Sequence, residues 1–370
     1  MRTLANMVEQ LGDEFDFRIL TSDRDLGDTL PYPHVSTGTW TPQGKAHVMY
    51  LSPSQQRLVA WRRLLQKIPY DILYLNSFFS TFTRKTLFWR RLGALPDRPI
   101  ILAPRGEFSE GALHLKSYKK RAYLTLAGRL GLYRHLLWQA SSEYEVQDIL
   151  RTVSRYHLDF NPTVVIAPNL FPKFSGQLRF TDVQKKGGAA HFIFLSRITQ
   201  KKNLKFTLQI LKKIRGDIQF DIYGPLEDAG YWRSCQAIIA QLPDRITVRY
   251  HGPVSPDSVS GIFSRYHAFL FPTLGENFGH VILESLTAGC PVVISDRTPW
   301  RNLARKYAGW DLPLEQPVSF QETIQQLVDM DQKTWKTWSE GARKTAEAFI
   351  YDPAIVEANR QLFYTALAKK

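Results

Sequence analysis

Short apolar segments alternate with amphipathic, helix-like stretches along the chain, and this alternation is the strongest constraint on its fold. Apolar runs of about four to eight residues, bounded by Gly, Pro and polar residues, are typical of buried strands. When such strands alternate with helices, they usually pair in parallel and the helices cover the sheet. The sequence therefore predicts an α/β fold, with strands at 15–21, 47–51, 71–75, 99–103, 136–138, 163–167, 192–195, 219–223, 246–250, 268–271 and 292–295.

The length of the chain favours two domains. A single hydrophobic core rarely organises as many as 370 residues, and an apolar share of 44% is enough for two cores. A polar stretch rich in Gly and Lys lies near the middle of the chain and is typical of a linker. We expect the parts to be a first domain, a linker, a second domain and a C-terminal segment, at 1–172, 173–190, 191–350 and 351–370.

The segment 271–295 carries two carboxylates around a predicted turn and helix. With a helix at 280–288, Glu276 would lie at its start and Glu284 about two turns inside. Backbone amides at 277–279 could hold an anion or a hydroxyl-rich ligand, and a carboxylate can accept hydrogen bonds from a sugar diol. The alternative is that Glu276 is an acid favoured by the helix dipole and that Glu284 is simply solvated.

A second segment, 191–204, combines an apolar strand with two cations. Arg197 follows the strand, and Lys202 opens the next helix. Two fixed cations would neutralise a nucleoside diphosphate as a sugar bond breaks. The alternative is a solvated helix start. Nearby, a strand runs into a Gly-Pro turn that makes Gly224 a third candidate.

Together these motifs resemble the Glu-x7-Glu signature of retaining glycosyltransferases with the GT-B fold, in particular glycosyltransferase family 4, also called glycosyl transferases group 1. The Ala-Gly-Cys-Pro-Val-Val run at 288–293 is similar to the family's entry into the next strand. Arg197 and Lys202 resemble its basic pair, with Asn203 where glycine is commoner. The resemblance implies two Rossmann-like domains facing a central cleft, and a last helix near 354–367 that crosses back to the first domain.

The resemblance also implies the roles of individual residues. Arg197 and Lys202 would stabilise the leaving group, Glu276 would contact the donor sugar, and Glu284 would bind ribose. The implied activity is metal-independent, retaining hexosyl transfer from a nucleotide sugar to a glycan or lipid-linked acceptor in cell-surface polysaccharide biosynthesis, without a cofactor. The other expected donor-binding positions are Asn277, Phe278, Gly279 and Gly224.

The first domain would bind the acceptor, and there the chain departs from the family. Arg105 stands in a loop where many members carry a histidine near the reacting sugar. It could hold an anionic acceptor or the diphosphate, or it could be a structural residue tied to Glu107 or Glu110. Asn76 and Ser77 follow a strand whose carboxyl end should face the cleft, so they are acceptor-side candidates.

The net charge of +14 is concentrated in one part of the chain. Between positions 57 and 134 there are sixteen Lys and Arg against four Asp and Glu, and one expected helix carries Lys116, Lys119, Lys120 and Arg121. A basic amphipathic face can bind anionic lipid, whereas no nucleic-acid motif is present; a plain solvated face is the simpler alternative. We expect a cytoplasmic protein, with the inner face of the plasma membrane as a candidate partner.

Other sequence features limit the chemistry. Cys235 and Cys290 are far apart and have no metal-ligand spacing, which favours buried thiols in a reducing compartment. No apolar run reaches the length of a bilayer-spanning helix. Two Asp-x-Asp triplets, at 23–25 and 329–331, are weak patterns, so we expect no metal site.

The beginning of the chain also departs from the resemblance. Related chains open with a strand and a Gly-Gly loop that packs against the donor phosphates, whereas this chain opens with an amphipathic helix. We therefore expect the first-domain sheet to lack its opening strand, which puts the activity of this polypeptide in doubt. The competing hypothesis is a catalytically impaired glycan- or nucleotide-binding subunit of the same fold.

Overall fold

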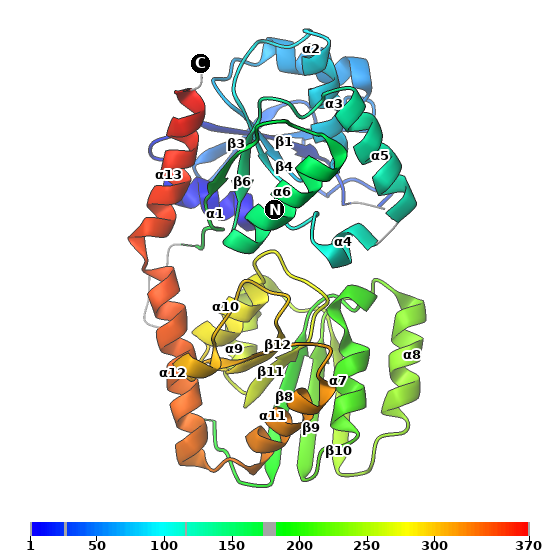
Figure 1. Cartoon of the computed structure of the whole chain (residues 1–370), viewed down its shortest axis with the longest axis vertical. Helices are drawn as coiled ribbons and strands as arrows, with labels where there is room; N and C mark the ends of the chain where they lie inside the picture. Colours follow the sequence, from blue (N-terminus) through cyan, green and yellow to red (C-terminus); the bar gives the residue numbers. More distant parts are fainter. Residues whose placement is uncertain (1, 26–27, 115–116, 173–182, 369–370) are drawn as a thin grey trace. The chain divides into compact units, whose positions relative to one another are not determined.

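The computed structural model describes residues 2–25, 28–114, 117–172 and 183–368, and the chain divides into two compact units (Figure 1). Unit 1 comprises Met1–Ser175 and Asp352–Lys370, and unit 2 comprises Gly176–Tyr351. Both units are α/β, and almost all strand pairs are parallel. The α/β prediction is confirmed, and every strand expected from the sequence forms.

Unit 1 contains two hydrogen-bonded sheets, in the strand orders β1-β3-β2 and β4-β5-β6-β7. Its elements are α1 (Arg2–Leu11), β1 (Phe17–Ser22), β2 (Trp40–Gln43), β3 (Ala46–Leu51), α2 (Leu58–Lys67), β4 (Leu73–Asn76), α3 (Thr81–Arg91), β5 (Ile100–Ala103), α4 (Glu110–His114), α5 (Ser117–Arg129), β6 (Leu137–Ala140), α6 (Glu143–Tyr156), β7 (Thr163–Ile166) and α13 (Pro353–Leu367).

Apolar clusters cover both faces of the β4-β5-β6-β7 sheet. On one face, Trp138 of β6 packs in a cluster with Leu124 of α5 and Ile149 of α6. On the other face, α1 and the last helix, α13, pack together, with Leu11 and Phe363 in one cluster. The last helix is therefore part of the core of unit 1, although it is separated in sequence from the rest of that unit by unit 2.

The sheet of unit 1 is interrupted between β1 and β4. In the described residues β1 pairs with β3 and β4 pairs with β5, and no pairing joins β1 to β4. Nevertheless the two strands contribute to the same apolar clusters, Phe17 with Tyr74 on one face and Leu20 with Leu73 on the other. Most of their residues are only half-buried, whereas those of β5 and β6 are fully buried. The expectation of a missing opening strand stays a prediction.

Unit 2 has one six-stranded parallel sheet, in the order β10-β9-β8-β11-β12-β13. Its elements are β8 (Ala189–Leu195), the 3-10 turn η1 (Gln200–Lys202), α7 (Leu204–Leu211), β9 (Asp217–Tyr223), α8 (Ala229–Ile239), β10 (Ile246–Gly252), η2 (Pro256–Ser258), α9 (Val259–Phe263), β11 (Ala268–Phe271), α10 (His280–Thr287), β12 (Val292–Ser295), η3 (Ala304–Lys306), β13 (Gly309–Leu312), α11 (Pro317–Asp329) and α12 (Gln332–Ile350).

Two edge strands were not predicted from the sequence. The short strand β2 contains Pro42 and pairs antiparallel with β3 at a sheet edge, where a residue without an N–H is tolerated. The other, β13, begins at Gly309, where a Cβ atom would lie 2.1 Å from the carbonyl oxygen of Val292. Glycine and proline obscured both strands, because they lower strand propensity without preventing an edge strand from pairing.

The expected linker is attached to unit 2 at its described end. Residues 173–182 of it lie outside the described residues. Lys185 is buried, and its Nζ donates hydrogen bonds to the carbonyl oxygens of Val328 and Met330 at 2.8 and 2.9 Å. Burial lowers the pKa of this ammonium group to about 8. The chain is therefore fixed to unit 2 before β8. This strand begins at Ala189, two residues before the expected start of the second domain at 191.

Both cysteines are free and buried, as expected. Burial raises the pKa of both thiols, that of Cys290 to about 12, so neither is an activated nucleophile. Within the described ranges no helix combines the length and the apolar composition needed to cross a bilayer.

The interruption of the unit 1 sheet between β1 and β4 predicts weak protection of these strands against amide hydrogen exchange. In the part of the chain that the structure describes, β1 and β4 each have an edge without a strand partner and half-buried side chains, so their amides should exchange hydrogen faster than those of β5 and β6. We expect a difference of roughly tenfold, which corresponds to about 1.4 kcal/mol. Hydrogen-exchange mass spectrometry on the full chain would measure it, with β8 and β11 as the protected reference. Equal protection across β1, β4, β5 and β6 would contradict this prediction.

Candidate functional site

Lys202 and Glu276 lie together, although 74 positions separate them in the sequence. Lys202 ends the turn η1 after β8, and Glu276 follows β11. Because β8 and β11 are hydrogen-bonded parallel neighbours, with Ala268 opposite Phe192, their carboxyl ends lie side by side. In parallel α/β sheets this edge is where ligands usually bind.

The two side chains form a largely desolvated ion pair. Lys202 Nζ donates to Glu276 Oε1, and Thr273 Oγ1 donates to the same oxygen at 3.2 Å. Only 10% of the Lys202 side chain and 14% of the Glu276 side chain are exposed. The ammonium group also lies 5.3 Å from the centre of the Phe271 ring. Each charge is therefore held in a fixed position by two partners.

Backbone hydrogen bonds fix the loops that carry this pair. The amide of Leu274 donates to the carbonyl oxygen of Lys201 at 2.8 Å, and Asn203 Nδ2 donates to Pro272 O at 2.9 Å. Asn203 adopts a left-handed backbone conformation with φ of 59°, which Asn tolerates better than most residues. The departure from the family's glycine at this position is therefore compatible with the turn.

The start of α10 is built around Gly279 and Phe278. Gly279 has φ of 74°, and a Cβ atom there would lie 2.7 Å from Ile282 Cδ1. The ring of Phe278 is buried against Trp300 and Phe349, with centroid distances of 5.6 and 5.5 Å. Trp300 Nε1 also donates to the carbonyl oxygen of Phe278 at 2.7 Å. Phe278 therefore anchors the loop through its side chain and carbonyl group.

Asn277 and Glu284 are both half-buried in this region. Glu284 lies on α10, which begins at His280, so it lies inside the helix as the spacing predicted. Both residues have further contacts within the protein.

Arg197 is not part of the Lys202–Glu276 cluster. Its Nη1 pairs with both carboxylate oxygens of Glu227 at 3.1 Å. The side chains of this pair are 60% and 41% exposed. In the part of the chain that the structure describes, no hydrogen bond or ion pair joins Arg197 to Lys202 or Glu276. Sequence reasoning placed the two cations at one site and did not anticipate Glu227.

Gly224 has a structural requirement of its own. Its φ is 130°, and a Cβ atom there would lie 1.9 Å from the carbonyl oxygen of Ser196. Tyr250 Oη donates to Gly224 O at 2.8 Å. The close approach of β9 to the loop that carries Arg197 therefore requires glycine, and contact with a nucleotide stays a prediction.

In unit 1, Arg105 connects the carboxyl ends of several strands. Its guanidinium donates to Asn76 Oδ1 at 2.9 Å, to Asn169 Oδ1 and to the Tyr74 hydroxyl. These partners are neutral, so the positive charge of Arg105 is hydrogen-bonded without being neutralised by them. Its φ of 57° is unusual for a residue with a side chain and indicates a conformation held by its surroundings.

The alternative that Glu107 holds Arg105 is wrong. The Glu107 carboxylate accepts hydrogen bonds from Ser77 Oγ at 2.8 Å and from the amides of Phe78 and Phe79 at 2.5 and 3.1 Å. Burial raises the pKa of this carboxyl group, and the three hydrogen bonds act in the opposite direction. Glu107 thus fixes the loop after β4, including Ser77, whose φ is 89°. The side chain of Glu110 lies outside the described residues.

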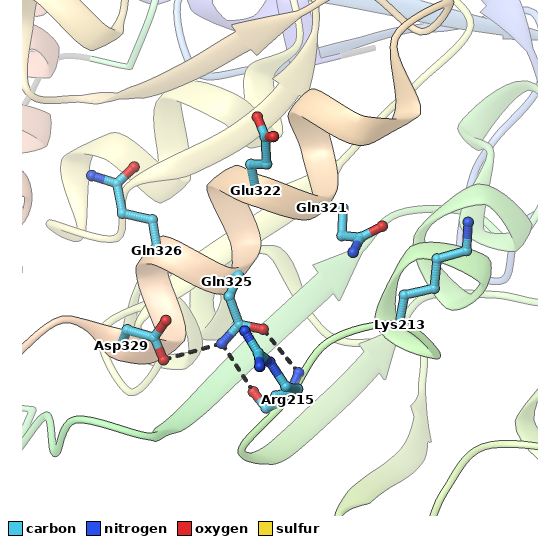
Figure 2. Close-up of a pocket in the computed structure, with 7 residues that line it drawn as sticks. All are labelled: Lys213, Arg215, Gln321, Glu322, Gln325, Gln326 and Asp329. Carbon is cyan, nitrogen blue, oxygen red and sulfur yellow. Dashed lines mark hydrogen bonds between the residues drawn. The ribbon is translucent and has the colours of Figure 1, made fainter.

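A surface pocket of about 460 Å³ lies elsewhere on unit 2. Figure 2 shows it between α11 and the segment that carries Lys213 and Arg215, with Gln325 hydrogen-bonded to Arg215 and Asp329. Arg215 precedes β9, so the pocket is at the amino edge of the sheet. Since Lys202 and Glu276 lie at the carboxyl edge, the pocket and the ion pair are different places.

The Asp-x-Asp triplets have structural roles. Asp23 forms an ion pair with Arg24, and Asp331 caps α12 by accepting a hydrogen bond from the amide of Thr334. The described residues contain no cluster of His, Cys, Asp or Glu suited to a metal ion.

Comparison with known proteins gives concordant results. Residues 178–345 match the family described as Glycosyl transferases group 1. A D-inositol 3-phosphate glycosyltransferase of Arthrobacter is 28% identical over 151 residues, which are 38% of this chain and 35% of that relative. The chain thus matches about a third of the relative's length.

Two solved structures resemble the whole chain. Sucrose-phosphate synthase of Thermosynechococcus elongatus has a TM-score of 0.73 at 14% identity, covering 99% of this chain and 93% of that one. HepE of Anabaena, solved with UDP and glucose, has a TM-score of 0.65 at 16% identity, covering 95% and 100%. These similarities show a fold of the GT-B type, and the family match spans the segments that carry Lys202, Glu276 and Glu284.

The burial of the ion pair predicts its effect on stability. Lys202→Met would leave the Glu276 carboxylate largely desolvated without its cation, at a cost of about 3 kcal/mol. The matched control is Arg197→Met, which breaks an exposed pair and should cost less than about 1 kcal/mol. Urea unfolding of the full chain would measure both. Adding Glu276→Gln to Lys202→Met should recover much of the loss, and equal losses from the two single variants would contradict the prediction.

Proposed function

We propose that this chain is a retaining glycosyltransferase that transfers a hexosyl group from a nucleotide sugar to a hydroxyl of a glycan or lipid-linked acceptor. The observation that carries the proposal is the Lys202–Glu276 pair at the carboxyl edge of β8 and β11, within the region that matches Glycosyl transferases group 1. A cation for phosphate and a carboxylate for sugar hydroxyls are what such a donor requires.

The pair would act on the two ends of the donor. Breaking the bond between sugar and diphosphate leaves negative charge on the phosphate, which a preorganised ammonium group stabilises. Glu276 Oε1 would stay paired with Lys202, while the other carboxylate oxygen would accept hydrogen bonds from sugar hydroxyls. The amides of Asn277, Phe278 and Gly279 precede α10 and add positive dipole ends on the donor side.

Other assigned residues have supporting roles in this proposal. Arg197 would exchange Glu227 for the donor diphosphate, which its exposure permits. Glu284 would bind ribose, and Gly224 would allow the nucleotide to approach the backbone. Charge on the leaving group would then be balanced by side chains, so we propose a metal-independent reaction. The acceptor oxygen would bond to the anomeric carbon on the face that the phosphate leaves, and the departing phosphate would take the acceptor proton, so that no separate protein base is needed.

On the acceptor side, we assign Arg105 to an anionic group of the acceptor. Its guanidinium is fixed by neutral partners and keeps its charge for a ligand, while Asn76 and Ser77 line the end of the adjacent strand β4. A phosphate-bearing or acidic glycan fits this chemistry. Such acceptors occur in cell-surface polysaccharide synthesis on the cytoplasmic side of the plasma membrane, which we propose as the setting.

A second candidate function is a non-catalytic glycan- or nucleotide-binding subunit. The break between β1 and β4 favours it, because β4 carries Asn76 at its carboxyl end and an incomplete sheet would hold this end less firmly. A screen with UDP-, GDP- and ADP-sugars would separate the two candidates. Nucleotide release with an acceptor, and an unchanged anomeric configuration in the product by NMR, supports transfer with retention. Binding without turnover supports the second candidate.

Removing either cation should slow sugar transfer. We expect Lys202→Ala and Arg197→Ala to lower kcat/KM by roughly 100-fold or more, the scale of losing one preorganised electrostatic partner. The matched control is Lys212→Ala, an exposed lysine at the far end of α7 whose loss should leave turnover unchanged. Steady-state kinetics with the best donor would measure this. Near-normal rates for both cation variants would refute their assignment.

The two glutamates should differ in their kinetic effects. Glu284→Gln should raise the donor KM more than it lowers kcat, because contact with ribose is the same in the ground and transition states. Glu276→Gln should chiefly lower kcat, because its contact with the sugar matters most as the bond breaks. The opposite pattern would mean that the roles are exchanged.

A further inference from the structure

Three helices of unit 1 have an unbalanced charge. Together α2, α3 and α5 carry eleven Lys and Arg residues and no Asp or Glu. Lys116, which the sequence places next to this group, lies outside the described residues. The exposed basic residues Arg63, Arg121 and Arg129 form no ion pair with a carboxylate in the described ranges. No carboxylate in the described ranges therefore neutralises the positive charge of these three arginines.

The three helices are joined into one continuous surface, here called the basic face. Trp89 Nε1 on α3 donates to the carbonyl oxygen of Leu58 on α2 at 2.8 Å. Arg91 Nε on α3 donates to the carbonyl oxygen of Leu130, which directly follows α5, at 2.8 Å. In Figure 1, α3 and α5 lie beside each other in unit 1. The exposed basic side chains of these helices therefore lie on neighbouring elements of unit 1.

Large apolar side chains are exposed on the same surface. Phe88 lies on α3, and Leu92, four residues later, follows the end of that helix. Leu126 lies on α5, and Leu130, also four residues later, follows its end. All four are exposed, Leu92 at 59% and Leu126 at 55%. Residues four apart share one side of a helix, and the bond from Arg91 to Leu130 brings the two pairs near each other. Exposed apolar side chains thus lie on the same helices as exposed arginines.

We propose that the basic face docks on an anionic lipid surface, with Phe88, Leu92, Leu126 and Leu130 inserted among the headgroups and the arginines paired with lipid phosphates. Charge complementarity selects an anionic surface, and the exposed apolar side chains, mostly leucine, favour lipid over nucleic acid. Nucleic acid is usually held by several aromatic rings that stack on bases, or by a recognisable motif, whereas three of the four apolar residues here are leucines and the sequence contains no nucleic-acid motif. The inference rests on the surface of unit 1 and does not depend on the proposed sugar transfer.

The test is flotation of the full chain with vesicles of phosphatidylcholine, with and without phosphatidylglycerol. The protein should bind only the anionic vesicles and should be released as salt rises. The variant Arg63→Glu/Arg121→Glu/Arg129→Glu should lower the partition coefficient by roughly 100-fold. Its matched control is Arg249→Glu/Arg305→Glu/Lys344→Glu, which changes the net charge equally on exposed residues of unit 2 and should keep most of the binding.

A second variant tests insertion separately from charge. Phe88→Ser/Leu126→Ser should lower binding by roughly tenfold at every salt concentration without changing the salt dependence. Because all five residues changed on the basic face are exposed, circular dichroism and the melting temperature should be unaltered. Equal binding to neutral and anionic vesicles would overturn the proposal, and so would an equal loss of vesicle binding in the unit 2 control. No loss of vesicle binding in the serine variant would also overturn it. The same holds if an oligouridine binds at least as tightly as anionic vesicles.

Discussion

The parallel pairing of β8 with β11 is the constraint on which the candidate donor site depends. It brings together two loops that are far apart in sequence, and the hydrogen bonds between Lys201 and Leu274 and between Asn203 and Pro272 hold them in register. Lys202 and Glu276 are then fixed as a largely desolvated pair before any ligand arrives. Preorganisation of this kind is useful because charges already in position need no rearrangement when negative charge develops on a leaving group.

Unit 1 is organised differently. The polar groups at its strand ends are held by one another: Arg105 bridges Asn76, Asn169 and Tyr74, while Glu107 fixes the loop at Ser77. This network maintains the left-handed backbone conformations of Ser77 and Arg105. The same unit has a sheet interrupted at β4, so the region assigned to the acceptor combines a rigid polar network with an incompletely paired strand. Unit 2, with its unbroken sheet, has no such weakness in the described residues.

Most of the fold could be predicted from sequence because apolar strands buried on both faces have a strong signature. Every expected strand forms, and α10 lies where Gly279 and Gly289 bracket it. The sequence could not reveal β2 and β13, whose Pro42 and Gly309 are tolerated only because these strands lie at edges. The resemblance implied that the last helix returns to the first domain, as it does, but the sequence could not reveal that α13 shares a core with α1.

For the candidate site, the sequence by itself determined which residues are candidates: Glu276 before a helix, Glu284 inside that helix, and two cations after a strand. Tertiary structure alone decided how they pair. It joined Lys202 to Glu276, gave Arg197 an exposed partner in Glu227, and gave Arg105 neutral partners, none of which is Glu107. The physical reason is that local spacing sets which face of an element a side chain occupies, whereas the order of strands in a sheet sets which distant side chains it meets.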